Sequence, residues 1–133
     1  MDTVISWIKP LAGVLCAGLT LLFGGIDTVL LVLIFLMATD YVSGVWSAAL
    51  SGTLSSKKGF SGLFKKIMIL AIVAVGHLIG RIVAIPEIRS LVIGFYIANE
   101  GISILENAGE LGVPLPEKLI EVLECLKTKN EIQ

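Results

Sequence analysis

The sequence predicts an all-α integral membrane protein, a bundle of four transmembrane helices followed by a short C-terminal amphipathic helix. Of its 133 residues, 56% are hydrophobic, and the mean hydropathy is +0.95. A soluble domain of this size needs more polar surface than these residues supply. The apolar residues also form blocks long enough to cross a bilayer, in place of the short alternating runs of a globular core.

The first two apolar segments, residues 4–23 and 28–50, are joined by a Gly-Gly-Ile-Asp turn. So short a connection predicts antiparallel neighbours. Residues 28–50 form the clearest span, roughly 34 Å of helix. If the regular helix of the first segment begins at Pro10, that helix is short and is expected either to span with tilt or to lie in the interface. No Ala-x-Ala-like site follows it, so we expect it to be retained as a helix.

Residues 51–66 are predicted to form the longest loop, which carries four lysines and no acidic residue. These basic loop residues are Lys57, Lys58, Lys65 and Lys66. The positive-inside rule places the loop, and with it both termini, in the cytoplasm; only Arg81 and Arg89 fall toward the outer side. Aromatic residues among the lysines are typical of a segment on an anionic inner leaflet. We expect no nucleic-acid partner, because the loop is tied between two spans.

Two further spans are predicted at residues 67–85 and 88–105. A Gly/Pro-rich break follows, and residues 116–126 have the apolar spacing of a short amphipathic helix, with Leu119, Ile120, Leu123 and Leu126 on one face. The predicted organisation is therefore a transmembrane domain at 1–107 and a cytoplasmic helix and tail at 108–133.

Small residues recur at intervals of four along three of the predicted spans. Such stripes let two helix backbones approach closely in a membrane, and they favour association of helices within or between chains. The predicted helix-packing residues are Gly13, Ala17, Gly44, Ala48, Gly76 and Gly80.

Lys9 and Arg89 lie near the starts of their predicted spans, and four other charged or titratable residues within the spans need explaining: Asp40, His77, Arg81 and Glu100. Each charge there costs about 2.5 to 3.5 kcal/mol on insertion scales, so each needs a partner or a water-filled surface. Counting from the expected cytoplasmic helix ends at residues 50 and 67 predicts that Asp40 and His77 lie at one depth and pair. The group could fix helix register by hydrogen bonding with the serines. It could instead line a water-filled path that responds to pH or membrane potential.

Catalysis is not expected. A hydrolytic site would combine Ser43 or Ser47 with His77, but no nucleophile-elbow motif, phosphate loop or zinc-binding pattern accompanies them. Cys16 and Cys125 lie in different regions and are expected to be unpaired thiols. The sequence therefore predicts no cofactor and no metal site.

Four segments together resemble the toxin-secretion and phage-lysis holin family, the bacteriophage holin family of Gram-positive bacteria and their phages. They are Thr-Asp-Tyr-Val-Ser-Gly-Val-Trp-Ser-Ala at 39–48, Ser-Ser-Lys-Lys-Gly-Phe-Ser-Gly-Leu-Phe-Lys-Lys at 55–66, Gly-His-Leu-Ile-Gly at 76–80, and residues 95–116. The resemblance covers nearly the whole chain from the second span onward.

The resemblance implies a holin: a protein that accumulates in the bacterial cytoplasmic membrane, forms homo-oligomers and opens lesions (pore formation) that time host cell lysis. Its functional partner would be an endolysin, or a secreted toxin, that passes the lesion without necessary direct contact. Two other functions stay open at this point. One is a small ion channel or transporter subunit that uses Asp40 and His77 as an intramembrane site, and the other is a scaffold for a larger membrane complex.

Overall fold

The computed structural model of the protein describes the backbone of residues 1–131, and their side chains apart from those of Asp2, Leu123 and 126–131. The described chain folds into five α-helices and contains no strand: α1 (Asp2–Phe23), α2 (Thr28–Leu50), α3 (Ser56–Ile82), α4 (Glu87–Glu110) and α5 (Glu117–Glu131). Four of them, α1 to α4, are long and apolar enough to cross a membrane. The predicted fold class is therefore confirmed.

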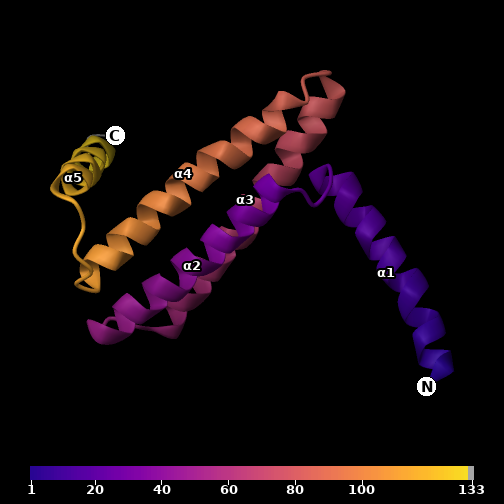
Figure 1. Cartoon of the computed structure of the whole chain (residues 1–133), viewed down its shortest axis with the longest axis horizontal. Coiled ribbons are helices and arrows are strands. Elements are labelled where there is room, and N and C mark those ends of the chain that lie inside the picture. The colour runs from indigo at the N-terminus through magenta and orange to yellow at the C-terminus, as the bar shows by residue number, and fades with distance from the viewer. Residues whose placement is uncertain (132–133) are drawn as a thin grey trace.

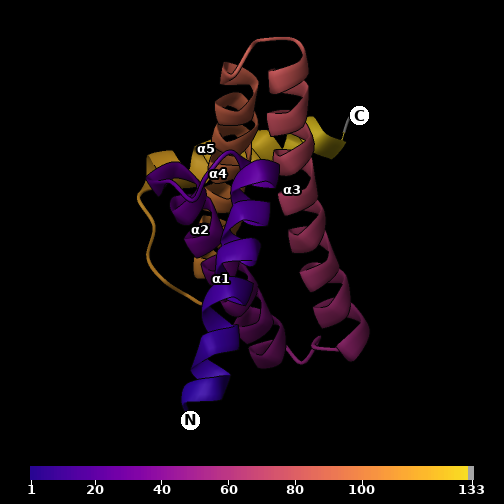
Figure 2. The same cartoon turned by 90° about the vertical axis from the view of Figure 1, so that its right-hand side faces the viewer.

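Helices α2, α3 and α4 form a bundle, and α1 projects away from it (Figures 1 and 2). Because each is joined to the next by a short turn, α2 and α4 run in the same direction, and α3, which lies between them in the sequence, runs in the opposite one. The largest interface is between α2 and α4, followed by that between α3 and α4. Helix α1 packs mainly against α3, and almost all of its residues are exposed.

The apolar core occupies the half of the bundle nearer the α1–α2 turn. Leu33, Val73 and Ile93, one from each helix of the bundle, are completely or almost completely buried. Leu30, Met37 and Ile69 complete the cluster. The outer surface carries large exposed apolar side chains, including Phe35, Trp46, Leu91 and Phe95. An apolar outer surface around a small core is the arrangement expected where lipid, not water, surrounds the helices.

Arg89 of α4 fastens the α1–α2 turn to the bundle. Its guanidinium donates to the carbonyl oxygens of Phe23 and Gly25, and it pairs with the Asp27 carboxylate at 2.8 Å. Asp27 is also the N-cap of α2, where its side chain accepts the backbone N–H of Leu30 at 3.1 Å. The otherwise unpaired carbonyl groups at the end of α1 are thus satisfied by a side chain from another helix.

The basic segment before the third span is mostly helical, so the prediction of a loop over residues 51–66 is wrong. Helix α3 begins at Ser56, because the Ser55 side chain caps it by accepting the backbone N–H of Lys58 at 3.2 Å. Ser55 is the kind of residue that starts a helix, and the glycines that follow it do not prevent one. The connection between α2 and α3 is only residues 51–55.

Two other boundaries differ from expectation. Helix α1 runs without interruption from Asp2 through Pro10, although proline removes one backbone hydrogen bond from a helix interior. Helix α4 continues to Glu110, past the expected end at residue 105. Helix α5 begins at Glu117, close to the expected start, and half-buried Leu119 lies on its expected apolar face. The Leu123 and Leu126 side chains of that face lie outside the described part.

Candidate functional site

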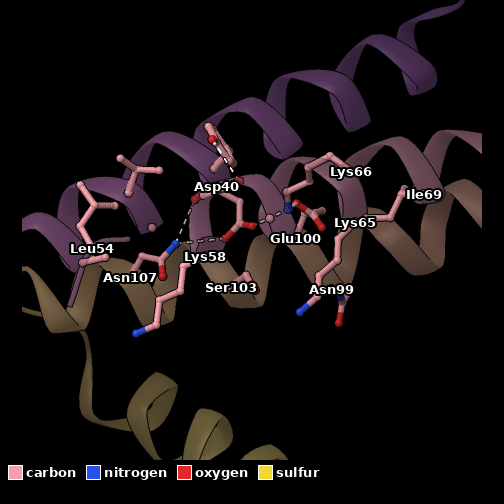
Figure 3. A pocket seen from close by; sticks show the side chains of 16 residues that line it. Asp40, Leu54, Lys58, Lys65, Lys66, Ile69, Asn99, Glu100, Ser103 and Asn107 are labelled. Atoms are coloured by element: carbon pink, nitrogen blue, oxygen red, sulfur yellow. Dashed lines mark hydrogen bonds and ion pairs between the residues drawn. The ribbon is translucent and has the colours of Figure 1, made fainter. Parts of the chain in front are cut away.

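A partly buried ion triad joins the three helices of the bundle (Figure 3). The Lys66 ammonium of α3 lies 2.5 Å from Asp40 Oδ2 of α2, and it also donates to Glu100 Oε2 of α4. The Lys66 and Asp40 side chains are each 15% exposed, and that of Glu100 is 3% exposed. One ammonium group is therefore shared by two carboxylates, and the helices shield most of the surface of all three side chains.

Hydrogen bonds between α2 and α4 extend the triad toward the α2–α3 end of the bundle. The Asn107 amide donates to Asp40 Oδ1 at 3.1 Å and to Ser43 Oγ at 2.9 Å. A single side chain of α4 thus bonds to two residues, one turn apart, on α2. Farther along, the Ser47 hydroxyl donates to Glu110 Oε2 at 2.6 Å. We call this set the polar seam: Asp40, Ser43, Ser47, Lys66, Glu100, Asn107 and Glu110.

Helical spacing explains how the sequence builds the polar seam. Asp40, Ser43 and Ser47 lie at intervals of three and four, so they share one face of α2. Their partners on α4 advance in the same direction along the chain, as two parallel helices require. The separation is 64 residues for Ser43 with Asn107 and 63 for Ser47 with Glu110. For Asp40 with Asn107 it is 67 residues, and together these bonds join α2 and α4 in one register.

The polar seam costs free energy that its own hydrogen bonds must offset. Burying an ion pair is expensive unless geometry is good and the remaining polar atoms are satisfied. Every buried side-chain nitrogen and oxygen in the described part of the chain has a hydrogen-bond partner. Interhelical hydrogen bonds in membranes are worth only about 0.6 kcal/mol each on average. The polar seam therefore determines how the helices pack against one another more than it adds to the stability of the fold. It also places polar side chains between helices whose outer surface carries many large apolar side chains.

The predicted pairing of Asp40 with His77 is wrong. Both carboxylate oxygens of Asp40 are engaged by Lys66 and Asn107. His77 lies instead at the α1–α2 turn, where a Cβ placed on Gly24 would be 2.7 Å from its imidazole ring. The error follows from the helix boundary: because α3 starts at Ser56, the residue level with Asp40 is Lys66. The structure therefore gives no basis for an ion site shared by Asp40 and His77.

Arg81, Lys57, Lys58 and Lys65 are all exposed, in contrast to Lys66. Arg81 lies in the last turn of α3, where a cation interacts favourably with the helix dipole. The three exposed lysines lie in the first turns of α3, near the α2–α3 connection.

The small residues of α2 and α3 lie at close helix contacts. A Cβ on Gly76 would be 3.0 Å from Val92 Cγ2 of α4, and one on Gly80 would be 2.8 Å from the Ile85 carbonyl oxygen. A Cβ on Gly44 would meet the Asn107 amide at 3.4 Å. Ala48 lies half-buried on the same face of α2 as Gly44.

The small residues of α1 are placed differently. A Cβ placed on Gly13 would have no described atom within 4 Å, and Ala17 is exposed. Gly13 therefore has open space around its Cβ position, and the Ala17 side chain lies on the exposed surface of α1.

Prediction from the sequence misses three members of the polar seam. It places Lys66 in a loop, and it places Asn107 and Glu110 beyond the end of the fourth span. Two signals could have found them: the Ser55 cap, which starts α3 early, and the recurrence of polar residues at helical spacing from Glu100 to Glu110.

Comparison with known proteins gives a family for this architecture. A family model described as the bacteriophage holin family matches residues 17–128. An uncharacterised protein of Clostridium acetobutylicum is 43% identical over 81% of this chain and 88% of its own length. An uncharacterised 14.9 kDa protein from the nagH 3' region of Clostridium perfringens is 39% identical over 98% of this chain and all of its own length. No solved structure is significantly similar to the chain.

Proposed function

Because the chain belongs to the bacteriophage holin family, we propose that it oligomerises in the bacterial cytoplasmic membrane and opens lesions that release an endolysin or a toxin. The family and the four apolar helices make it a holin-like, helical membrane protein. The observation that carries the finer proposal is the polar seam, a row of hydrogen-bonded polar side chains between helices whose outer surface carries many large apolar side chains. In an assembly of many copies, separation of α2 from α4 turns these polar side chains toward water.

Helix α1 supports self-association. It projects from the bundle, and on its small-residue face the Cβ position of Gly13 has no described atom within 4 Å and Ala17 is exposed. A helix with small residues at intervals of four packs closely against another helix in lipid. The partner that we propose for it is a second copy of this protein.

The distribution of charge supports one orientation in the membrane. Lys57, Lys58 and Lys65 are exposed at the α2–α3 end of the bundle, whereas Arg89 lies at the opposite end, at the α1–α2 turn. We propose that the lysine end faces the cytoplasm and its anionic leaflet, with both termini on the same side. Residues 1–107 are then the transmembrane domain, and residues 108–133 form a cytoplasmic helix and tail.

Timed induction in a bacterium tests the proposal. Membrane potential is followed with a voltage-sensitive dye, and turbidity is recorded with and without a co-expressed endolysin. The expected result is a delay, a sudden collapse of the potential, and lysis only where the endolysin is present. Gly94→Ala is a matched control for expression, because a Cβ at Gly94 meets no described atom within 4 Å. Undiminished potential and growth at a high level of membrane-inserted protein would rule out lesion formation.

A cytoplasmic reporter protein distinguishes lesion formation from the activity of an ion channel. Cells without endolysin but with a large folded cytoplasmic protein are expected to release that protein after the potential collapses. Selective, graded ion flux with no release of protein would instead identify a channel.

A further inference from the structure

A cavity of about 430 Å³ opens beside the polar seam between α2, α3 and α4 (Figure 3). One part of its wall is apolar and includes Val45, Leu54 and Ile69. Another part is polar and includes Lys58, Lys65 and Asn99. Its size falls in the range of small-molecule sites, roughly 300 to 1,000 Å³.

The fold holds this cavity open. Helix α3 makes much less contact with α2 than with α4. The Tyr41 side chain of α2 bridges the resulting space, and its hydroxyl donates to the Gly59 carbonyl oxygen at 3.3 Å. Its ring would lie 3.4 Å from a Cβ placed on Gly62. The phenol therefore acts as a spacer, and the glycines of α3 leave room for it.

The charged side chains at the cavity wall differ in whether they have ion-pair partners. Asp40, Glu100 and Lys66 also line the cavity, and both carboxylates pair with Lys66. Together with Lys58 and Lys65, the lining carries three cationic and two anionic groups, a formal net charge of +1. Lys58 and Lys65 are exposed and have neither an ion pair nor a side-chain hydrogen bond within the described structure. They lie seven residues apart, two helical turns on one face of α3. Figure 3 shows both side chains, together with Asn99, extending toward the same open side.

We infer that this cavity binds the phosphate group of an anionic phospholipid. Two ammonium groups without an ion pair, next to an amide donor in a lining of net positive charge, suit an anion, and the apolar wall suits the adjoining acyl chain. Lipid reaches the cavity if the α2–α3 end lies at the inner leaflet. The inference therefore rests on the membrane orientation proposed above, but it is independent of lesion formation.

Native mass spectrometry of the full chain, purified in a mild detergent, tests the inference. Phosphatidylglycerol, phosphatidylcholine and inorganic phosphate are added in separate arms. The variant Lys58→Gln/Lys65→Gln removes both ammonium groups. Lys9→Gln/Lys118→Gln makes the same change in net charge at two exposed lysines that do not line the cavity. Ala48→Leu narrows the cavity without altering charge.

Wild type and the remote double variant are expected to retain phosphatidylglycerol equally. Lys58→Gln/Lys65→Gln should lower its apparent affinity by roughly tenfold to thirtyfold, since each lysine near an anionic lipid contributes on the order of a tenfold factor or less. Ala48→Leu should lower it also, while the helical circular dichroism of all variants stays unchanged. Equal retention by all four proteins would overturn the inference. So would retention of phosphatidylcholine as strong as that of phosphatidylglycerol, or binding of inorganic phosphate without lipid.

Discussion

Lys66 Nζ lies 2.5 Å from Asp40 Oδ2, and the two residues stand equally far from the facing ends of their helices. Asp40 is ten residues before the last residue of α2, and Lys66 is ten residues after the first residue of α3. Since the two helices are antiparallel and joined by a short connection, residues at equal distances from that connection lie at one depth. The ion pair is therefore a consequence of where α3 begins.

Replacing Lys66 with methionine should destabilise the bundle strongly. Asp40 and Glu100 would remain buried without a countercharge, and breaking a buried pair in this way typically costs about 3 to 5 kcal/mol. Thermal unfolding in detergent micelles, followed by circular dichroism, measures the loss. Lys57→Met is the matched control, because Lys57 is exposed on the same helix; its effect should stay within about 0.5 kcal/mol.

The triple variant Asp40→Asn/Lys66→Met/Glu100→Gln should regain most of that stability. It removes all three charges together, and neutral replacements of buried ion groups are often tolerated. A triple variant as unstable as Lys66→Met would show that lost packing by the lysine stem, and not an unpaired charge, causes the defect.

Asp40 and Lys66 should be energetically coupled, whereas Asp40 and His77 should not. Residues that share an ion pair show coupling energies of about 0.5 to 3 kcal/mol in double-mutant cycles, and residues without shared partners are nearly additive. The cycles Asp40→Asn with Lys66→Gln, and Asp40→Asn with His77→Ala, are compared by thermal unfolding in micelles. Non-additivity in the second cycle would contradict the placement of His77 at the α1–α2 turn.

The same substitutions bear on function. Asp40→Asn and His77→Ala should each shift the onset of lysis after induction, because one weakens the polar seam and the other the contact with Gly24. Unchanged onset in Asp40→Asn would limit the seam to helix packing.

The fold class could be predicted from the sequence because it depends on composition and block length alone. Span 28–50 coincides with α2, since an apolar run bounded by Gly-Gly and Ser-Gly leaves little freedom in its ends. The polar seam could not be derived in the same way. Its pairs depend on the relative depth of three helices, and an error of eleven residues at the start of α3 (67 expected, 56 observed) replaced Lys66 by His77 as the partner of Asp40.

Adding a methyl group at Gly80 should disturb the α3–α4 turn. The new Cβ would lie 2.8 Å from the Ile85 carbonyl oxygen, a backbone atom that cannot move aside as a flexible side chain does. Overpacking of this kind costs about 1 to 3 kcal/mol. Gly80→Ala is therefore expected to lower the unfolding temperature in micelles. Gly94→Ala should not lower it, because no described atom lies within 4 Å of its Cβ position and alanine favours a helix.

The ion pair between Asp27 and Arg89 should weaken only at acidic pH. The Arg89 hydrogen bond holds the pKa of Asp27 below its ordinary value of 3.8. Burial opposes this effect, and the Leu30 backbone hydrogen bond and the Arg89 charge add to it. A carboxylate with a lowered pKa in the folded state contributes stability that is complete above 3.8. That contribution is lost as the pH falls through the lowered value.

Thermal unfolding of the wild type and of Asp27→Asn, recorded in micelles between pH 7 and pH 2.5, checks this dependence. The difference between their unfolding temperatures should be constant from pH 7 down to about pH 5, and it should shrink below pH 4 as Asp27 takes up a proton. The asparagine still accepts the Leu30 N–H but carries no charge for Arg89, so it isolates the ion pair from the helix cap. A temperature difference that grows as the pH falls would have the wrong sign for a carboxylate stabilised by Arg89. It would show that this ion pair does not hold the end of α1 against the bundle.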